Sequence, residues 1–383
     1  GTWSTHTPHT LVIQKGFGDL IIDCNSPSFA RHTAYIPSKA ELSNFGNIAS
    51  LGMLSVVDVN NGAGYRYPEH YKFSIITMLK SYWRHYTTRF QLSLLILLFF
   101  VINFFIQIVL TVIFQKLGYL NAADLSTINT LSPVSKINAF MVFQAISSTF
   151  SFAGVAFLFS YFMHPQPLAY IQYRPSNTTL YYCLIPIVII AAIPFVQHIN
   201  SLVGQIPMGT AIKRYEDNMN ELFKGLMQMH NGQDLIIRLF VFALVPAICE
   251  EYFFRGVLLR LLLQIVGHPG KAIMISSLAF ALIHMEPHAF ISLCLSGIML
   301  GYIYLWTGSL RYSIFAHALF NGIQIVIEYI TQMQNLAPIE QLPAIITITA
   351  ILLFMASFYF LFKHKIEAPD NWLNNFRDET INN

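Results

Sequence analysis

Long runs without a charged residue constrain this chain more than any other feature of its sequence. A helix that rises about 1.5 Å per residue needs about 20 apolar residues to cross the hydrocarbon core of a bilayer. The runs therefore predict an all-α fold, a polytopic transmembrane helix bundle with about eight helices. We place these helices near 91–114, 138–163, 180–203, 235–262, 271–286, 288–307, 310–331 and 342–362.

Two of the predicted spans are unusual. Pro186 and Pro194 lie within 180–203, so we expect that helix to be broken or tilted, because proline removes a backbone hydrogen bond. The span 271–286 is short for a membrane crossing. We therefore expect it to be a buried helix that its neighbours shield from lipid.

The composition supports a membrane protein and excludes one class of partner. Charged residues make up 11% of the chain, against about 25% in soluble domains. Lysine and arginine exceed the acidic residues by only three charges and form no cluster, which excludes nucleic acid as a partner. The four cysteines are far apart and suggest no disulfide framework or metal motif. The first partner that we expect is the lipid bilayer.

The positions of lysine and arginine predict the orientation in the membrane, because cytoplasmic loops are enriched in both. Lys80, Arg84 and Arg89 precede the first span, which places that end in the cytoplasm. Alternation along the spans then puts Lys363 on the same side. We therefore predict an integral membrane protein with both termini cytoplasmic, and the short loops favour a bacterial inner membrane.

Three polar segments flank or interrupt the bundle of residues 78–363. Residues 1–77 have no apolar run of membrane length, and we expect a poorly ordered N-terminal extension, with a small folded domain as the alternative. Residues 364–383 form a polar C-terminal tail. Between the third and fourth spans, one helical stripe predicts an amphipathic helix that either lies in the membrane interface or covers the bundle. Its apolar residues are Met219, Leu222, Phe223, Leu226 and Met227.

Ionisable residues inside membrane spans are costly and therefore indicate functional sites. The fourth span carries Glu250, Glu251 and Arg255 among apolar neighbours. Glu251 and Arg255 are four residues apart, which is the favourable spacing for a helical ion pair. Glu250 points roughly 100° away from Glu251 and needs a different partner.

Polar residues on other spans are candidates for that partner, and we expect them to converge with Glu250. They are His284, and the pair His317 and Asn321, which share one helical face. This set suits hydrolysis of a peptide bond, because Glu250 and His284 can activate water while His317 and Asn321 donate hydrogen bonds to an oxyanion.

Other interpretations remain open. A mid-span histidine or asparagine often only joins helices, so the protein could be a non-enzymatic immunity, scaffold or transport protein. Two histidines and a carboxylate also suit catalytic zinc, with Glu250, His284 and His317 as ligands. No HExxH, GxSxG or paired-aspartate motif occurs. His288 follows His284 at helical spacing, but Pro287 predicts that the helix ends between them.

Three motifs in order resemble those of the CPBP family of CAAX proteases and bacteriocin-processing proteins. They are Glu250-Glu251-x-x-x-Arg255, Phe280-x-x-x-His284 and His317-x-x-x-Asn321, within about 235–325. The resemblance implies an intramembrane protease with a water-filled cavity and a peptide or membrane-protein substrate. We expect no cofactor, with a divalent metal such as zinc as the alternative. The resemblance also implies that Glu250 and His284 activate water, that His317 and Asn321 form the oxyanion site, and that Glu251, Arg255 and Phe280 support them.

Overall fold

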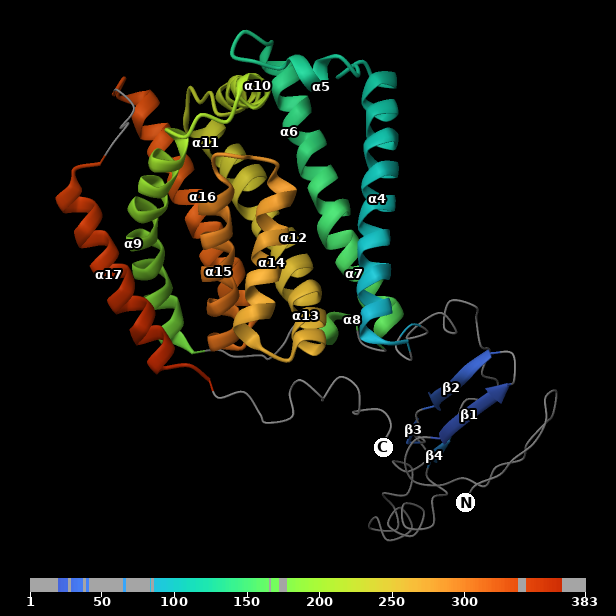
Figure 1. Cartoon of the computed structure of the whole chain (residues 1–383). Helices are drawn as coiled ribbons and strands as arrows, with labels where there is room; N and C mark the ends of the chain where they lie inside the picture. Colours follow the sequence, from blue (N-terminus) through green and yellow to red (C-terminus); the bar gives the residue numbers. More distant parts are fainter. Residues whose placement is uncertain are drawn as a thin grey trace, which may run out of the picture. The chain divides into compact units, whose positions relative to one another are not determined.

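The computed structural model divides the chain into two compact units, Gly1–His85 and Tyr86–Asn383, and each is described by itself (Figure 1). The described residues are 20–26, 29–36, 39–40, 65–66, 83, 86–164, 167–171, 178–336 and 342–366.

The first unit contains two small antiparallel sheets. Strands β1 (Leu20–Ser26) and β2 (Phe29–Ile36) form a hairpin in which Leu20 pairs with Ile36. Strands β3 (Lys39–Ala40) and β4 (Tyr65–Arg66) pair in the second sheet. The rest of the segment 1–77, for which we predicted a polar extension, lies outside the described residues, as does most of the tail 364–383.

The second unit is a helix bundle, which confirms the predicted all-α membrane fold (Figure 1). Among the described residues, seven helices are long and apolar enough to cross a membrane, and α14 is a shorter eighth. The chain is therefore an integral membrane protein. The eight are α4 (Thr88–Lys116), α6–η3–α7 (Val134–Met163), α9 (Thr179–Gly204), α11–η4–α12–η5–α13 (Gly232–Val266), α14 (Pro269–His284), α15 (Phe290–Thr307), α16 (Leu310–Met333) and α17 (Ala344–Lys363).

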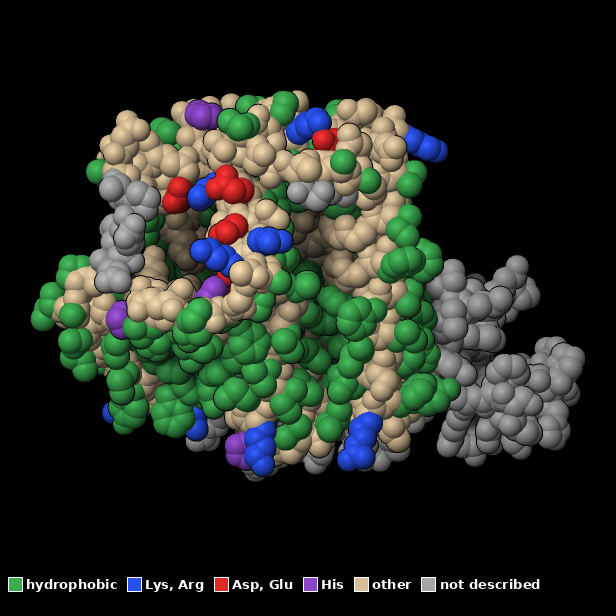
Figure 2. Space-filling model, turned by 45° about the horizontal axis from the view of Figure 1, so that its top comes forward, with side chains coloured by type: hydrophobic (Ala, Val, Ile, Leu, Met, Phe, Trp, Pro, Cys, Tyr) green, Lys and Arg blue, Asp and Glu red, His purple; other side chains and the backbone are tan. Residues whose placement is uncertain are grey.

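The two ends of the bundle differ in what covers them. Helix α4 begins and α17 ends at the lower end in Figure 1, where the short helix α8 (Pro167–Ile171) also lies. The upper end carries α5 (Asp124–Thr127) and α10 (Thr210–Leu226). Figure 2 shows that charged side chains gather at this upper end, whereas hydrophobic side chains cover the flank beneath it. The side of the membrane on which each end lies stays a prediction.

Helix α9 differs from the expectation that its prolines would break it. The helix runs from Thr179 to Gly204 through both Pro186 and Pro194. Membrane helices tolerate proline because neighbouring helices and local adjustments satisfy the freed carbonyl groups. The prediction of a break at these positions is therefore wrong.

Helix α14 ends at His284, as Pro287 predicted. Pro269 lies in its first turn, and Met285 stops it with a left-handed backbone (φ 54°). One face of α14 is buried against the bundle, but Met274, Leu278 and Leu282 on the other are exposed. The expectation that neighbours shield α14 on all sides is therefore wrong. A helix at the rim of the bundle has partners on one face only.

Two glycines on α15 set the position of α14. A Cβ atom on Gly297 would lie 2.9 Å from Cβ of Ser277, and one on Gly301 would lie 2.8 Å from Cγ2 of Ile273. Real Cβ atoms do not approach other carbons so closely. Small residues allow membrane helices to pack backbone against backbone. The two glycines therefore hold α14, and His284 at its end, close to α15.

The sequence left two arrangements open for α10, one in the membrane interface and one as a cover on the bundle. The structure has features of both. Its C-terminal end packs on the bundle, where Leu226 and the following Met227 are buried. Met219 and Phe223 of the same predicted stripe are exposed. Leu222 packs partly against the bundle as well, so the apolar stripe is divided between the bundle and the outside.

Candidate active site

The fourth membrane segment changes its winding on either side of the adjacent glutamates. It consists of α11 (Gly232–Arg238), η4 (Leu239–Leu244), α12 (Val245–Glu251), η5 (Tyr252–Leu258) and α13 (Leu259–Val266), in which η4 and η5 are π-helical. Such π-helical turns are rare and occur frequently at functional sites. Here they bracket α12 and so set the directions in which Glu250 and Glu251 project.

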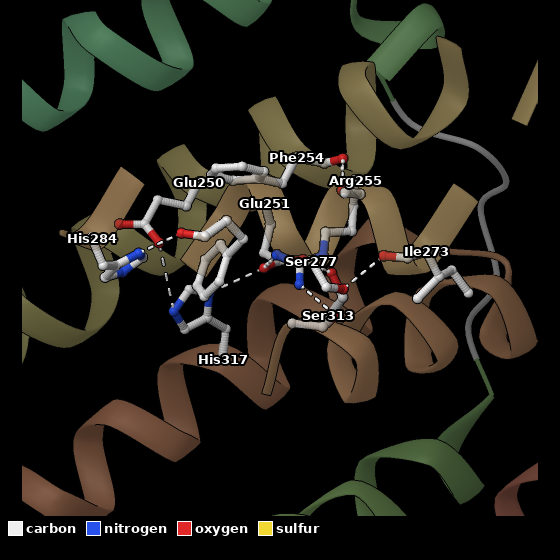
Figure 3. Close-up of polar contacts among 12 residues, drawn as sticks. Glu250, Glu251, Phe254, Arg255, Ile273, Ser277, His284, Ser313 and His317 are labelled. Carbon is white, nitrogen blue, oxygen red and sulfur yellow. Dashed lines mark hydrogen bonds and ion pairs between the residues drawn. The ribbon is translucent and has the colours of Figure 1, made fainter. Parts of the chain in front are cut away.

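Glu251 is the centre of a buried polar network, and the predicted ion pair with Arg255 is confirmed. An oxygen of Glu251 lies 2.6 Å from Nη1 of Arg255, and neither side chain is more than 2% exposed. Arg255 also donates to the carbonyl oxygen of Gly297 on α15 at 2.9 Å. Ser313 on α16 donates to the other oxygen of Glu251. The network therefore joins α12, η5, α15 and α16 (Figure 3).

His317 bridges the two adjacent glutamates. Its Nδ1–H donates to Oε1 of Glu251 at 3.0 Å. The Nε2 atom of the same ring lies 3.9 Å from Oε2 of Glu250 (Figure 3). The imidazole is thus held by Glu251 on one side and presented to Glu250 on the other.

Glu250 lacks the partners that Glu251 has. The residue is 8% exposed, and its Oε2 atom is buried without a hydrogen-bond partner among the described residues. An unsatisfied buried carboxylate oxygen carries a large desolvation cost. Buried polar groups in this position are normally completed by water or a ligand. The geometry therefore leaves a hydrogen-bonding position beside Glu250.

His284 lies beside Glu250, as Figure 3 shows. Its Nδ1 atom is 2.8 Å from the carbonyl oxygen of Phe280, one turn earlier in α14. A carbonyl oxygen only accepts hydrogen bonds, so Nδ1 carries the hydrogen. The neutral ring then has a lone pair on Nε2. His284 can therefore accept a proton or orient a water beside Glu250.

Phe280 is packed between the polar groups of the site. Its ring centroid lies 4.6 Å from that of His284 and 6.0 Å from that of His317. The guanidinium carbon of Arg255 lies 5.1 Å from the same centroid, within cation–π range. Phe280 therefore contacts both histidine rings and Arg255, and its supporting role stays a prediction.

Asn321 has a structural partner that the sequence analysis did not foresee. Its Nδ2 donates to the carbonyl oxygen of Phe242 at 3.3 Å. Pro246 lies four residues after Phe242 and has no N–H to donate to that carbonyl. Asn321 therefore supplies the hydrogen bond that Pro246 removes. The second hydrogen on Nδ2 of Asn321 is then the one that could be donated to an oxyanion.

Metal binding by Glu250, His284 and His317 was the alternative left open by the sequence. Among the residues that the structure describes, no group of three or more histidine, cysteine, aspartate or glutamate side chains is arranged to hold a metal ion. The expectation of no cofactor stays a prediction.

Two members of the site were missed by sequence reasoning. Ser313 lies four residues before His317, so the spacing Ser313-x-x-x-His317-x-x-x-Asn321 places all three on one helical face. That spacing was the available signal. The carbonyl oxygen of Gly297 gave no signal, because a backbone acceptor on another helix leaves no mark in the sequence.

The fold and the site together define a polytopic helical membrane protein with a buried glutamate–histidine centre. Residues 232–323 match the family model described as Rce1-like, type II CAAX prenyl endopeptidase Rce1-like. The match confirms the predicted resemblance and is consistent with membership of the CPBP family. It contains every site residue named above. Comparisons with curated proteins and with solved structures gave no match.

Proposed function

We propose that this protein is a CPBP-type intramembrane endopeptidase that hydrolyses a peptide bond of a peptide or membrane-protein substrate. The observation that carries the proposal is the buried Oε2 of Glu250, which has no hydrogen-bond partner among the described residues and has His284 and His317 beside it. The family match to residues 232–323 supports the same class of activity. The bacterial inner membrane, with both termini cytoplasmic, is the location that accompanies this proposal.

In the proposed mechanism, a water molecule occupies the hydrogen-bonding position beside Glu250. Glu250 takes one proton from the water, while Nε2 of His284 accepts a hydrogen bond that orients it. The water oxygen attacks the carbonyl carbon of the scissile bond, and the carbonyl oxygen becomes an oxyanion. Glu250 then gives its proton to the leaving amine when the C–N bond breaks, so the carboxylate is restored.

The oxyanion is stabilised by donors on α16 in this scheme. Nε2 of protonated His317 and the second amide hydrogen of Asn321 supply the hydrogen bonds. Loss of one such donor typically lowers the rate by about 10²- to 10³-fold. Nε2 of His317 lies 3.9 Å from Oε2 of Glu250, which supports its assignment to the oxyanion.

Cleavage by the purified protein tests the proposal. The protein is reconstituted in lipid vesicles with a library of apolar peptides, and the products are identified by mass spectrometry. Glu250→Ala and His284→Ala should each abolish cleavage, while the exposed His230→Ala serves as a matched control that keeps it. Full activity of Glu250→Ala would overturn the mechanism.

A non-enzymatic immunity, scaffold or transport protein is the second candidate. One observation favours it: His317 and Asn321 each make a hydrogen bond of a structural kind, to Glu251 and to the Phe242 carbonyl. In that case Glu250→Gln should fold and keep biological function, because an amide of the same shape preserves packing. Loss of function in a folded Glu250→Gln protein would favour the enzyme.

A further inference from the structure

We infer that Glu251 is a positioning residue for catalysis: it fixes the ring of His317 so that Nε2 points toward Glu250 and the reacting carbonyl. This inference rests on the proposed function and extends it, because Arg255 was the only contact that the sequence predicted for Glu251, and the resemblance implied no more than a supporting role. The observation behind it is that one carboxylate meets three donors from two helical segments, Arg255, Ser313 and His317.

The two oxygens of Glu251 accept hydrogen bonds from different donors. Oε1 accepts from Arg255 at 2.6 Å and from His317 at 3.0 Å. Oε2 accepts from Ser313, one turn before His317 on α16. Each contact limits rotation of the carboxylate, and the side chain is 0% exposed, so no solvent competes for it. The acceptor that His317 meets is therefore fixed in place.

The fixed acceptor keeps a hydrogen on Nδ1 of His317, and the proposed oxyanion role requires a second hydrogen on Nε2. An ionised carboxylate accepts hydrogen bonds and donates none, so Nδ1 must be the protonated nitrogen in this contact. Rotation of the ring by 180° would break the bond to Glu251 and turn Nε2 away from Glu250. The hydrogen bond on the far nitrogen of a functional histidine commonly sets its orientation in this way.

Arg255 contributes to the stability of the fold through contacts of its own. It compensates the charge of Glu251 and reaches across to Gly297 of α15. Removal of one member of a buried ion pair strands a charge and destabilises the fold. A single substitution at Glu251 would therefore both destabilise the fold and release the ring of His317, and the two effects could not be told apart. The test must therefore remove the charges of Glu251 and Arg255 together.

Two double variants separate these effects. Glu251→Gln with Arg255→Met keeps an amide oxygen that accepts from Nδ1 of His317 and an amide N–H that bonds the Ser313 hydroxyl. Glu251→Met with Arg255→Met has a similar shape but no acceptor. Both remove the buried ion pair, so they differ in the hydrogen bonds to His317 and to Ser313. Ser313→Ala added to both variants leaves the contact with His317 as the difference between them. Thermal unfolding in detergent establishes that both are folded.

The expected result is a difference in kcat and none in KM. The methionine variant should have a kcat about 10²- to 10³-fold below that of the glutamine variant, as for loss of one oxyanion donor. Substrate binding does not involve Glu251, so KM should agree within about two-fold. Equal kcat values for the two folded variants would overturn the inference and leave Glu251 a structural residue.

A spectroscopic measurement tests the inference independently of the proposed function. In protein labelled with ¹⁵N-histidine, His317 is assigned by its disappearance in His317→Gln. We expect protonated Nδ1 in the wild type and the glutamine variant, and a changed Nδ1 signal in the methionine variant. An unprotonated Nδ1 in the wild type would overturn the inference. Cleavage that survives in Glu250→Ala would instead refute the proposed function.

Discussion

His317 joins the two adjacent glutamates of the fourth membrane segment. Its Nδ1 lies 3.0 Å from Glu251 and its Nε2 lies 3.9 Å from Glu250. The two carboxylates differ because Glu251 has further donors in Arg255 and Ser313, whereas Oε2 of Glu250 has no hydrogen-bond partner among the described residues. Two neighbours in the sequence thus differ in that Glu251 has several hydrogen-bond donors and Glu250 keeps a buried oxygen without one among the described residues.

Asn321 can be tested separately for its structural and its catalytic contribution. Asn321→Ala leaves the Phe242 carbonyl unsatisfied, which should cost about 1–3 kcal/mol of stability. Pro246→Ala adds a backbone N–H that can bond that carbonyl, so the double variant should recover thermal stability. We expect its kcat to stay about 10²- to 10³-fold low. Full recovery of activity would show that Asn321 only replaces the missing proline donor.

Gly297 should couple helix packing to the position of His284. A Cβ at this residue would lie 2.9 Å from Cβ of Ser277, so Gly297→Ala must push α14 away from α15. We expect a loss of about 1–3 kcal/mol, as for overpacked cores, together with reduced cleavage. Gly204→Ala is the control, because a Cβ there meets nothing within 4 Å. Equal melting temperatures for the two variants would contradict the prediction.

A contact at the α10 end of the bundle should depend on pH. His288, in the loop after α14, donates its backbone N–H and Nδ1–H to Glu216 of α10, and its Nε2–H to the Ile206 carbonyl. Only the protonated ring has both N–H groups. The hydrogen bond to Ile206 and the contact with Glu216 raise the pKa of His288 above its usual 6.5. A raised pKa means that this stabilisation is complete below pH 6.5 and is lost as the pH rises through the raised value.

Hydrogen exchange of residues 206–216 measures this effect. Exchange should be slow at pH 5.5 and should accelerate at pH 8.5, after correction for the intrinsic rate. His288→Gln removes the titrating group and should make the protection independent of pH. A pH effect of the same size in that variant would assign it to another group.

Chelation tests the expectation that no metal takes part. With Glu250 and His284 as the water-activating pair, cleavage should persist after treatment with a strong chelator, and added zinc should not increase kcat. Elemental analysis of the active, detergent-purified protein is the accompanying measurement. Loss of activity that returns with stoichiometric zinc would instead support the ligand set Glu250, His284 and His317.

The sequence by itself determined the membrane fold and most of the site. Apolar runs gave eight helices, because a bilayer admits few other structures. The scarcity of charge inside these runs made Glu250, Glu251 and Arg255 visible, and helical spacing predicted the Glu251–Arg255 contact. His284, His317 and Asn321 were found by the same argument.

Tertiary structure decided which atoms these residues present to one another. Whether His317 contacts Glu251 as well as Glu250, and whether Asn321 bonds the Phe242 carbonyl, depends on how α16 packs against the fourth segment. The predicted break in α9 and complete shielding of α14 failed for the same reason, because neighbouring helices decide both. Spacing fixes the face of a helix on which a residue lies, but packing fixes the partner that this face meets.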